Sequence, residues 1–173
     1  MKIVQKIFGM ILIILLAILF ASIFGALHNQ LSYSVSNEFF EEYLFGNFGV
    51  NEWGIQNERL KASIIGVLGS YWVGLYLGIL YAIIYVFLKT NQNLKNILSA
   101  ISLNLMVAFI GSIVGYILAH FFIPQENTGV FIDFGIQRPQ NYIEAAYMNT
   151  GSYYAGFFGL VIGIIYLAMK NQK

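Results

Sequence analysis

The two histidines of the chain, His28 and His120, are its most versatile chemical groups, because imidazole binds metals and exchanges protons near neutral pH. His28 directly follows the first long apolar stretch, and His120 lies near the end of the third. If successive stretches cross a membrane, the first and the third run in the same direction. The sequence therefore predicts that both histidines lie at the same depth, close to one membrane surface.

Other polar residues extend the set of groups around the histidines. The predicted outer polar cluster consists of His28, Asn29, Gln30, Tyr33, Glu38, Glu41, Glu42, Arg59 and His120. Two imidazoles and a carboxylate can hold a divalent metal with an open coordination position. Two histidines can also ligate a haem, and His28 beside Glu38 can perform general acid–base or proton-relay chemistry.

The spacing of these residues does not select one of these chemistries. The histidines come from different predicted helices, and the chain contains no short H-x-x-x-H spacing. A structural alternative is that His28, Asn29 and Gln30 form hydrogen bonds between the loop and the helix ends. We therefore assign neither a metal nor a cofactor from the sequence.

Most familiar catalytic and binding motifs are absent from the sequence. Zero cysteines exclude disulfides and thiol chemistry, and no Walker loop, serine elbow or H-E-x-x-H occurs. The kinase-like triplet from Asp133 to Gly135 has no accompanying catalytic or glycine-rich loop. A net charge of +1 gives no basic surface for nucleic acid, so nucleic-acid partners are not expected.

The apolar stretches that position these groups dominate the composition, which is 58% hydrophobic and 10% charged. Four of them, Ile7–Leu27, Ala62–Leu88, Ile97–Phe122 and Met148–Met169, contain no Asp, Glu, Lys or Arg. Each exceeds the roughly 20 residues that a helix needs to cross a bilayer. The sequence therefore predicts an all-α fold, a four-transmembrane-helix bundle forming one domain over residues 1–173. The spans are expected at about 7–27, 62–88, 97–122 and 148–169.

The first stretch also shares features with a secretory signal peptide, since Lys2 and Lys6 precede it. Its apolar run of about 20 residues is longer than an ordinary signal-peptide core. Cleavage after Ala26 would place Phe24 at the −3 position, where a small residue is required. An uncleaved membrane anchor is therefore expected.

Charged residues are segregated along the chain. The termini and the segment between the second and third spans carry only lysines, namely Lys2, Lys6, Lys89, Lys95, Lys170 and Lys173. The outer segments, about 28–61 and 123–147, carry Arg59, Lys61, Arg138 and the eight acids Glu38, Glu41, Glu42, Glu52, Glu58, Glu126, Asp133 and Glu144. The positive-inside rule then places both termini in the cytoplasm.

Local signals predict further elements in the outer segments. Asn37 is a candidate N-cap for a short helix over Glu38–Phe45, which Gly46 would end. The aromatic face of this helix suggests that it lies along the membrane interface. Asn57 is expected to cap the second span, and Pro139 to begin the helix that leads into the fourth.

Small residues recur every fourth position in the spans, where they allow helices to approach closely. The predicted packing residues are Gly66, Ser70, Gly74, Gly78, Asn104, Gly151, Ala155, Gly159 and Gly163. Packing within the chain, dimerisation or a pore lined by small residues are all compatible with this pattern. Asn104, a strongly polar side chain well inside a span, is expected to form an interhelical hydrogen bond or, alternatively, a substrate contact.

The segment GALHNQLSYSVSNEFF, residues 25–40, resembles a family of uncharacterised bacterial integral membrane proteins. That family carries H-[DN]-Q-x-[ST]-x-x-[VI]-S-x-E-[YF]-F after its first span and [WY]-W-V-G-L in its second, which Tyr71–Leu75 matches. The resemblance covers roughly residues 20–80. Asn29 stands where the family usually has Asp, and Tyr71 where it has Trp, so His28 lacks an acidic neighbour. The resemblance implies a bacterial cytoplasmic membrane and this architecture, and it supplies no substrate.

Three functional classes follow from this organisation. The first, which we favour over an enzyme, is a membrane scaffold or binding protein that uses its extracytoplasmic face, formed by residues 28–42 and 123–147. The alternative is a small membrane-embedded enzyme or metal or redox protein using His28, Glu38 and His120. An oligomeric channel or transporter is the third class, which the absence of acids from the spans disfavours. The expected partners are the lipid bilayer, a membrane or extracytoplasmic protein, and further copies of the chain.

Overall fold

The computed structural model describes residues 3–88, 93–124, 129–132 and 135–171. Four long helices account for most of them: α1 (Ile3–Val35), α3 (Glu58–Phe87), α4 (Asn93–Phe122) and α5 (Pro139–Asn171). All four are long and apolar enough to cross a membrane, and the described residues include no strand. The chain is thus an all-α membrane protein, and the predicted bundle of four transmembrane helices is confirmed.

The helices extend beyond the apolar stretches that identified them. The outer segment predicted to begin at residue 28 instead continues α1 as helix to Val35. At 1.5 Å per residue, the 33 residues of α1 measure about 50 Å, against about 30 Å of hydrocarbon. A helix does not end where its side chains become polar, because its backbone hydrogen bonds continue to form. His28 and Tyr33 therefore belong to a transmembrane helix rather than to a loop.

Two of the predicted helix starts are confirmed. The Oδ1 atom of Asn57 accepts a hydrogen bond from the backbone N–H of Leu60 at 3.1 Å, which makes Asn57 the N-cap of α3. Pro139 is the first residue of α5, where its missing N–H costs no intrahelical bond.

The short helix between α1 and α3 is present, but its boundaries differ from those predicted. It begins after Ser36, whose Oγ accepts a hydrogen bond from the N–H of Phe39 at 3.2 Å. Asn37 is therefore not the cap, and its amide instead donates to the Glu41 carboxylate at 3.3 Å. The helix does not stop at Gly46, and it turns only at Gly49, whose φ of +68° suits glycine.

This segment contains three short pieces. They are the π-helix η1 (Phe39–Leu44), the α-helical turn α2 (Phe45–Asn47) and the 3₁₀-helix η2 (Val50–Trp53). Phe39, Phe40 and Phe45 are buried against the ends of α3 and α5. The segment thus closes one end of the bundle with an aromatic cluster.

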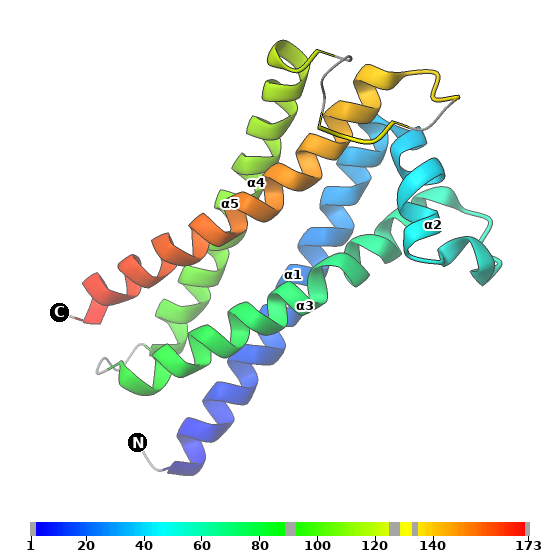
Figure 1. The fold of residues 1–173 in the computed structure, drawn as a ribbon. Helices are drawn as coiled ribbons and strands as arrows, with labels where there is room; N and C mark the ends of the chain where they lie inside the picture. The colour runs from blue at the N-terminus through cyan, green and yellow to red at the C-terminus, as the bar shows by residue number, and fades with distance from the viewer. Residues whose placement is uncertain (1–2, 89–92, 125–128, 133–134, 172–173) are drawn as a thin grey trace.

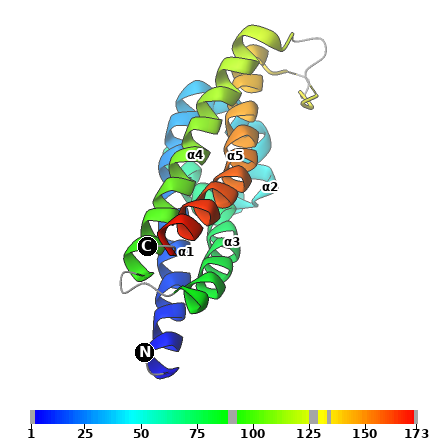
Figure 2. The same cartoon turned by 90° about the vertical axis from the view of Figure 1, so that its left-hand side faces the viewer.

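The four long helices form two crossed pairs, α1 with α3 and α4 with α5 (Figures 1 and 2). Contacts within each pair are extensive, and contacts between the pairs are sparse. Two buried clusters join the pairs. One centres on Ile13, Tyr81, Ile97 and Leu167, and the other is the aromatic cluster under the short helices.

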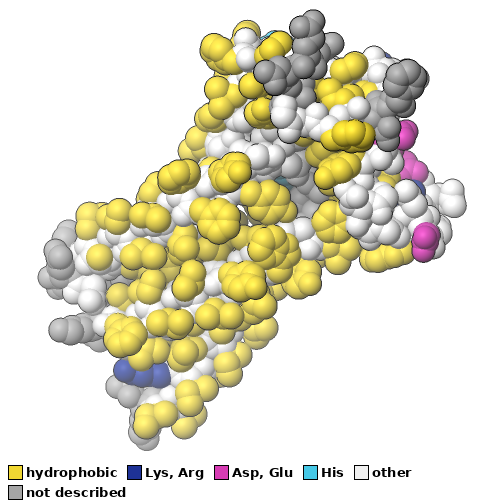
Figure 3. All heavy atoms as spheres, viewed as in Figure 1, with side chains coloured by type: hydrophobic (Ala, Val, Ile, Leu, Met, Phe, Trp, Pro, Cys, Tyr) yellow, Lys and Arg dark blue, Asp and Glu magenta, His cyan; other side chains and the backbone are white. Residues whose placement is uncertain are grey.

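The two ends of the bundle carry different charges, as the space-filling view shows (Figure 3). Near the N-terminus, Lys6 donates to the carbonyl oxygen of Val86 at 3.4 Å, which brings the start of α1 to the end of α3. We call this end, with Lys95 and Lys170, the lysine end, and the end with the short helices the acidic end. The predicted assignments of Lys2, Lys89, Lys173, Glu126 and Asp133 lie outside the described residues.

Candidate functional site

Glycines create the close approach of α1 and α3. A Cβ atom on Gly66 would collide with the backbone of Gly25, near Ser70. On Gly74 it would lie 2.7 Å from the carbonyl oxygen of Ala17, and on Gly78 it would lie 2.9 Å from the Cα of Ile14. The predicted packing glycines of α3 therefore lie at its interface with α1.

The second pair is built in the same way. A Cβ atom on Gly151 would lie against the backbone of Gly111, and one on Gly111 would strike the Ala155 methyl group. A Cβ atom added to Gly159 would lie 3.0 Å from the Cα of Asn104. One added to Gly163 would strike the Tyr81 hydroxyl of the other pair. The predicted small residues thus pack helices within the chain.

Between the pairs, the acidic half of the bundle is joined by polar side chains. His28 of α1 forms a hydrogen bond between its Nε2 and Ser112 Oγ of α4, at 2.8 Å. Asn149 of α5 donates to Ser32 Oγ at 3.0 Å, and Asn141 donates to the carbonyl oxygen of Val35 at 3.1 Å. His28, Ser32 and Ser112 are all buried. Buried polar groups with partners fix one arrangement of the two pairs, because losing a partner leaves a desolvated group.

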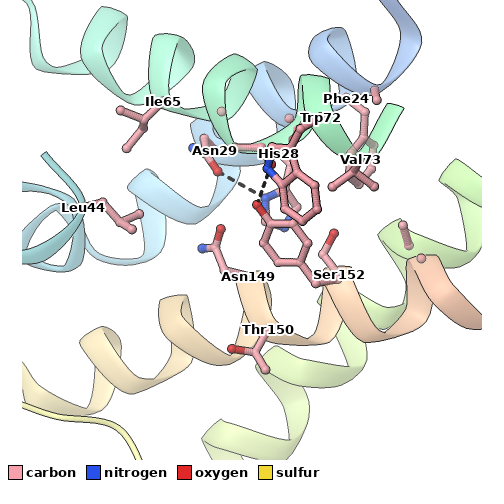
Figure 4. A pocket seen from close by; sticks show the side chains of 18 of the residues that line it. Phe24, His28, Asn29, Leu44, Ile65, Trp72, Val73, Asn149, Thr150 and Ser152 are labelled. Atoms are coloured by element: carbon pink, nitrogen blue, oxygen red, sulfur yellow. Dashed lines mark hydrogen bonds between the residues drawn. The ribbon is translucent and has the colours of Figure 1, made fainter. Parts of the chain in front are cut away.

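A cavity of about 560 Å³ lies between the pairs, bounded by the two buried clusters. All four long helices line it, and Figure 4 shows Asn149 and Ser152 of α5 pointing toward His28 and Asn29 of α1. Trp72 of α3 and Tyr153 of α5 stack at one side, with ring centroids 6.5 Å apart. The sequence alone gives no indication of this cavity.

The cavity lining is largely apolar and contains no Asp, Glu, Lys or Arg among the described residues. Its polar groups include His28, Asn29, Asn149, Thr150, Ser152 and Asn104. Asn104 of α4 is 1% exposed, and its side chain interacts with the buried hydroxyl of Tyr81 in α3. Both polar atoms, the Tyr81 hydroxyl and the Asn104 Nδ2, are buried, so this contact belongs to the packed interior between the two helix pairs.

The cavity opens between α3 and α5. Three lining residues near the middle of these helices, Tyr76, Leu80 and Phe157, are 62%, 42% and 66% exposed on the outer surface. Beside this opening, the Tyr153 hydroxyl donates to the carbonyl oxygen of Gly69 at 3.0 Å, and at the acidic end the exposed Tyr43, Phe48 and Phe131 also line the cavity. The exposed rim between α3 and α5 is therefore formed by aromatic and aliphatic side chains of two membrane helices.

His120, the second histidine, is paired elsewhere. Its Nδ1 lies 2.8 Å from the Oε1 atom of Glu144, a carboxylate with 6% of its side chain exposed, while the His120 side chain is 46% exposed. Next to this pair, Gln140 donates to the carbonyl oxygen of Ala119 at 2.9 Å. The pair joins the acidic ends of α4 and α5, and Glu144 was absent from the predicted cluster.

Glu38 has a third, separate role. Its two carboxylate oxygens accept hydrogen bonds from the backbone N–H groups of Gln137 and Arg138, at 2.8 and 2.9 Å. These groups directly precede α5, whose N-terminus is electropositive. The carboxylate of Glu38 thus fastens the short helix to the start of α5.

The other members of the predicted cluster form a surface network. Gln30 donates to the carbonyl oxygen of Arg59 at 2.8 Å, and the Arg59 guanidinium donates back to the Gln30 side-chain oxygen at 3.2 Å. Tyr33 donates to Glu41 at 2.7 Å, and Arg59 lies over the Tyr33 ring. Glu42 is exposed. Asn29 instead lies in the interior, where it donates to the carbonyl oxygen of Ala62 at 3.1 Å.

The structure therefore does not bring the predicted cluster together, and beside the surface network its two histidines and Glu38 form separate contacts. His28, Glu38 and His120 bond to Ser112, to the start of α5 and to Glu144, respectively. Among the described residues, no group of three or more His, Asp or Glu side chains is placed to hold a metal ion. The cavity residues Asn149, Ser152 and Trp72 were missed, because four-residue spacing of small residues predicts packing and cannot reveal a gap between two pairs.

Comparisons with protein-family models, curated proteins and solved structures found no match for this chain. The class of protein is therefore defined by the fold and the site alone: an all-α membrane protein of two helix pairs with a cavity between them.

Proposed function

We propose that this protein is a non-enzymatic binding protein of the membrane, which holds a small, largely apolar ligand in the cavity between its helix pairs. The observation that carries the proposal is the cavity of about 560 Å³, which has an apolar lining, a few convergent polar groups and an opening on the flank of the bundle. Ligand sites commonly combine these three features at this size.

The position of the polar groups supports binding over catalysis. His28 forms hydrogen bonds with Ser112 and, weakly at 3.4 Å, with its neighbour Asn29, and no carboxylate lines the cavity among the described residues. General acid–base chemistry by a histidine ordinarily draws on a second group that orients or charges it, such as a carboxylate. A binding role needs only shape and hydrogen bonds, and the cavity offers both.

For the orientation, we propose that both termini and the lysine end lie in the cytoplasm of a bacterium. The support is the distribution of lysines and acids, together with the resemblance of residues 20–80 to a bacterial membrane family. Because the chain has no cysteine, single-cysteine variants at Glu41 and Lys95 can be labelled with an impermeant maleimide in intact cells. We expect the maleimide to label only the Glu41→Cys variant. Labelling of only the Lys95→Cys variant would show the opposite orientation.

The binding proposal is tested by blocking the cavity. A Cβ atom added to Gly156, which lines the cavity, would meet only Ala108, at 4.0 Å. Gly156→Leu should therefore place a side chain inside the cavity and narrow it without disturbing the helices. Val161→Phe, on the exposed surface of the same helix and outside the cavity, is the matched control.

Each variant is purified in mild detergent, and small molecules that remain bound are extracted and measured by mass spectrometry. We expect the wild type and Val161→Phe to retain a common apolar compound at near-stoichiometric amounts, and Gly156→Leu to lose it. Equal retention by all three folded proteins, or retention by none of them, would overturn the proposed function.

A further inference from the structure

A second hollow lies at the lysine end, on the outer surface of the bundle. It is a groove along one face of α4, and Tyr166 of α5 lines it from the neighbouring helix. The start of α4 and the end of α5 lie next to each other there (Figures 1 and 2). The groove and the cavity between the pairs share no lining residue. The groove is therefore a separate candidate site, which does not depend on the proposed function.

Positive charge gathers at one end of this groove, with no carboxylate in the neighbouring helices to balance it. Lys95 lines the groove in the first turn of α4. Lys170, in the last turn of α5, places its Nζ over the Tyr166 ring, 5.6 Å from the ring centroid. α4 contains no Asp or Glu, and the single acids of α3 and α5, Glu58 and Glu144, lie at the opposite ends of these helices. An anion at this position would gain two cations and would meet no like charge.

The groove changes from polar to apolar along α4. At a rise of 1.5 Å per residue, Ser99 lies about 6 Å along the helix from Lys95, and Met106 about 16 Å. Leu98 and Leu103 line the stretch between, and Met106 is 56% exposed. In a membrane helix, exposed apolar side chains contact hydrocarbon, and a lysine at the helix end reaches the headgroups. The groove therefore runs from the headgroup level into the hydrocarbon.

From this arrangement we propose that the groove binds an anionic phospholipid of the surrounding bilayer. The phosphate lies between Lys95 and Lys170, the ester region lies beside Ser99, and one acyl chain lies along Leu103 and Met106. The order of groups in the lipid matches the order of charge, hydroxyl and apolar side chains in the groove. A zwitterionic lipid carries its own cation to the same place, and it gains less from the two lysines.

A tryptophan at the apolar end of the groove reports which lipid occupies it. Met106→Trp is made in a background in which the two native tryptophans, Trp53 and Trp72, are replaced by Phe. The protein is placed in phosphatidylcholine vesicles that contain increasing fractions of phosphatidylglycerol with brominated chains. A parallel series uses brominated phosphatidylcholine. Because bromine quenches tryptophan only at short range, the two series give the relative affinity of the groove for the two lipids.

Two matched controls separate the groove from the rest of the surface. Phe158→Trp in the same background reports on lipid outside the groove, since Phe158 is 70% exposed on α5 and lines neither the groove nor the cavity. Phe158 is nearly as far along the helix from Lys170 as Met106 is from Lys95, so both tryptophans lie at a similar depth. Lys6→Gln is the charge control, because Lys6 belongs to the same end but lies outside the groove.

At Met106→Trp we expect about a tenfold preference for phosphatidylglycerol at low salt, from the attraction between two lysines and an anionic lipid. Adding both Lys95→Gln and Lys170→Gln should reduce this preference to about twofold or less, because the groove then carries no charge. Lys6→Gln should leave it nearly unchanged. The cavity variant Gly156→Leu should also leave it unchanged, since the cavity is a separate site.

Three outcomes would overturn this inference. One is that Met106→Trp shows no preference, or only the preference that Phe158→Trp shows, since the lysine end would then attract anionic lipid without a defined site. Another is an equal loss of preference in Lys6→Gln and in the double variant. The third is quenching at Met106→Trp that falls as the protein-to-lipid ratio rises, because a second copy of the chain would then cover the groove. None of these outcomes concerns the cavity, so the proposed function is tested separately.

Discussion

The interfaces within the helix pairs and the interface between the pairs are built from different residues. Within the pairs, glycines such as Gly66 and Gly151 bring the backbones of two helices into contact. Between the pairs, side chains such as His28 and Asn149 form hydrogen bonds around a cavity. In a membrane, close backbone packing supplies most of the helix association, since lipid is as apolar as the side chains.

This difference suggests that the interfaces within the pairs and the interface between the pairs have different roles. We expect each pair to behave as a unit, because the two backbones meet directly at the glycines. The interface between them depends on a few polar contacts and leaves space for a ligand. Substitutions within a pair should therefore affect folding, and those between the pairs should have smaller effects on stability and larger effects on binding.

The largest effect is expected for Gly66→Leu. Its side chain would collide with the backbone of Gly25, which cannot move aside as a flexible side chain can. We expect destabilisation by about 3 kcal/mol or more. The measurement is unfolding in a titration of SDS into mild detergent, with Gly46→Leu, which meets no atom within 4 Å, as the control. Equal stability of the two variants would contradict the view that the pair is closely packed.

A smaller effect is expected for His28→Leu, which removes the partner of the buried Ser112 hydroxyl. The expected loss is about 2 kcal/mol, the cost of leaving a buried polar group unpaired. Adding Ser112→Ala should restore part of this stability, because both partners are then apolar. Strictly additive losses in the same SDS titration would show that the two residues are not coupled.

Glu38→Gln tests the contact between the short helix and the start of α5. The neutral amide keeps one acceptor oxygen but loses the charge that interacts with the helix N-terminus. We expect a loss of about 1 kcal/mol, together with faster amide exchange at the start of α5. The exposed Glu42→Gln is the matched control, and comparable exchange in both variants would rule out the capping role.

The smallest effect is expected for Arg59→Lys on the exposed surface network. Lysine cannot reproduce the two separate guanidinium contacts with Gln30 and Ser34. Exposed polar contacts of this kind contribute about 0.5 kcal/mol or less. A loss as large as that of His28→Leu, measured under the same conditions, would show that the surface network joins the molecule as strongly as the buried contacts do.

Much of the fold could be predicted because its signals are local. The apolar stretches identify four transmembrane helices, and Asn57 and Pro139 mark two helix starts, since a cap needs only its own first turn. The cap at Ser36 was assigned to its neighbour Asn37, because both residue types favour this position. Local chemistry does not decide between two adjacent candidates.

The sequence by itself determined that this chain crosses a membrane and that its lysines and acids are separated along it, because hydrophobic length and charge are properties of short segments. Only the tertiary structure decided that α1 pairs with α3 and α4 with α5, that His28 meets Ser112 rather than Glu38, and that a cavity remains between the pairs. These features depend on which helix faces cross and at what angle. Repeated small residues permit many such crossings, and the packing of the whole chain selects one.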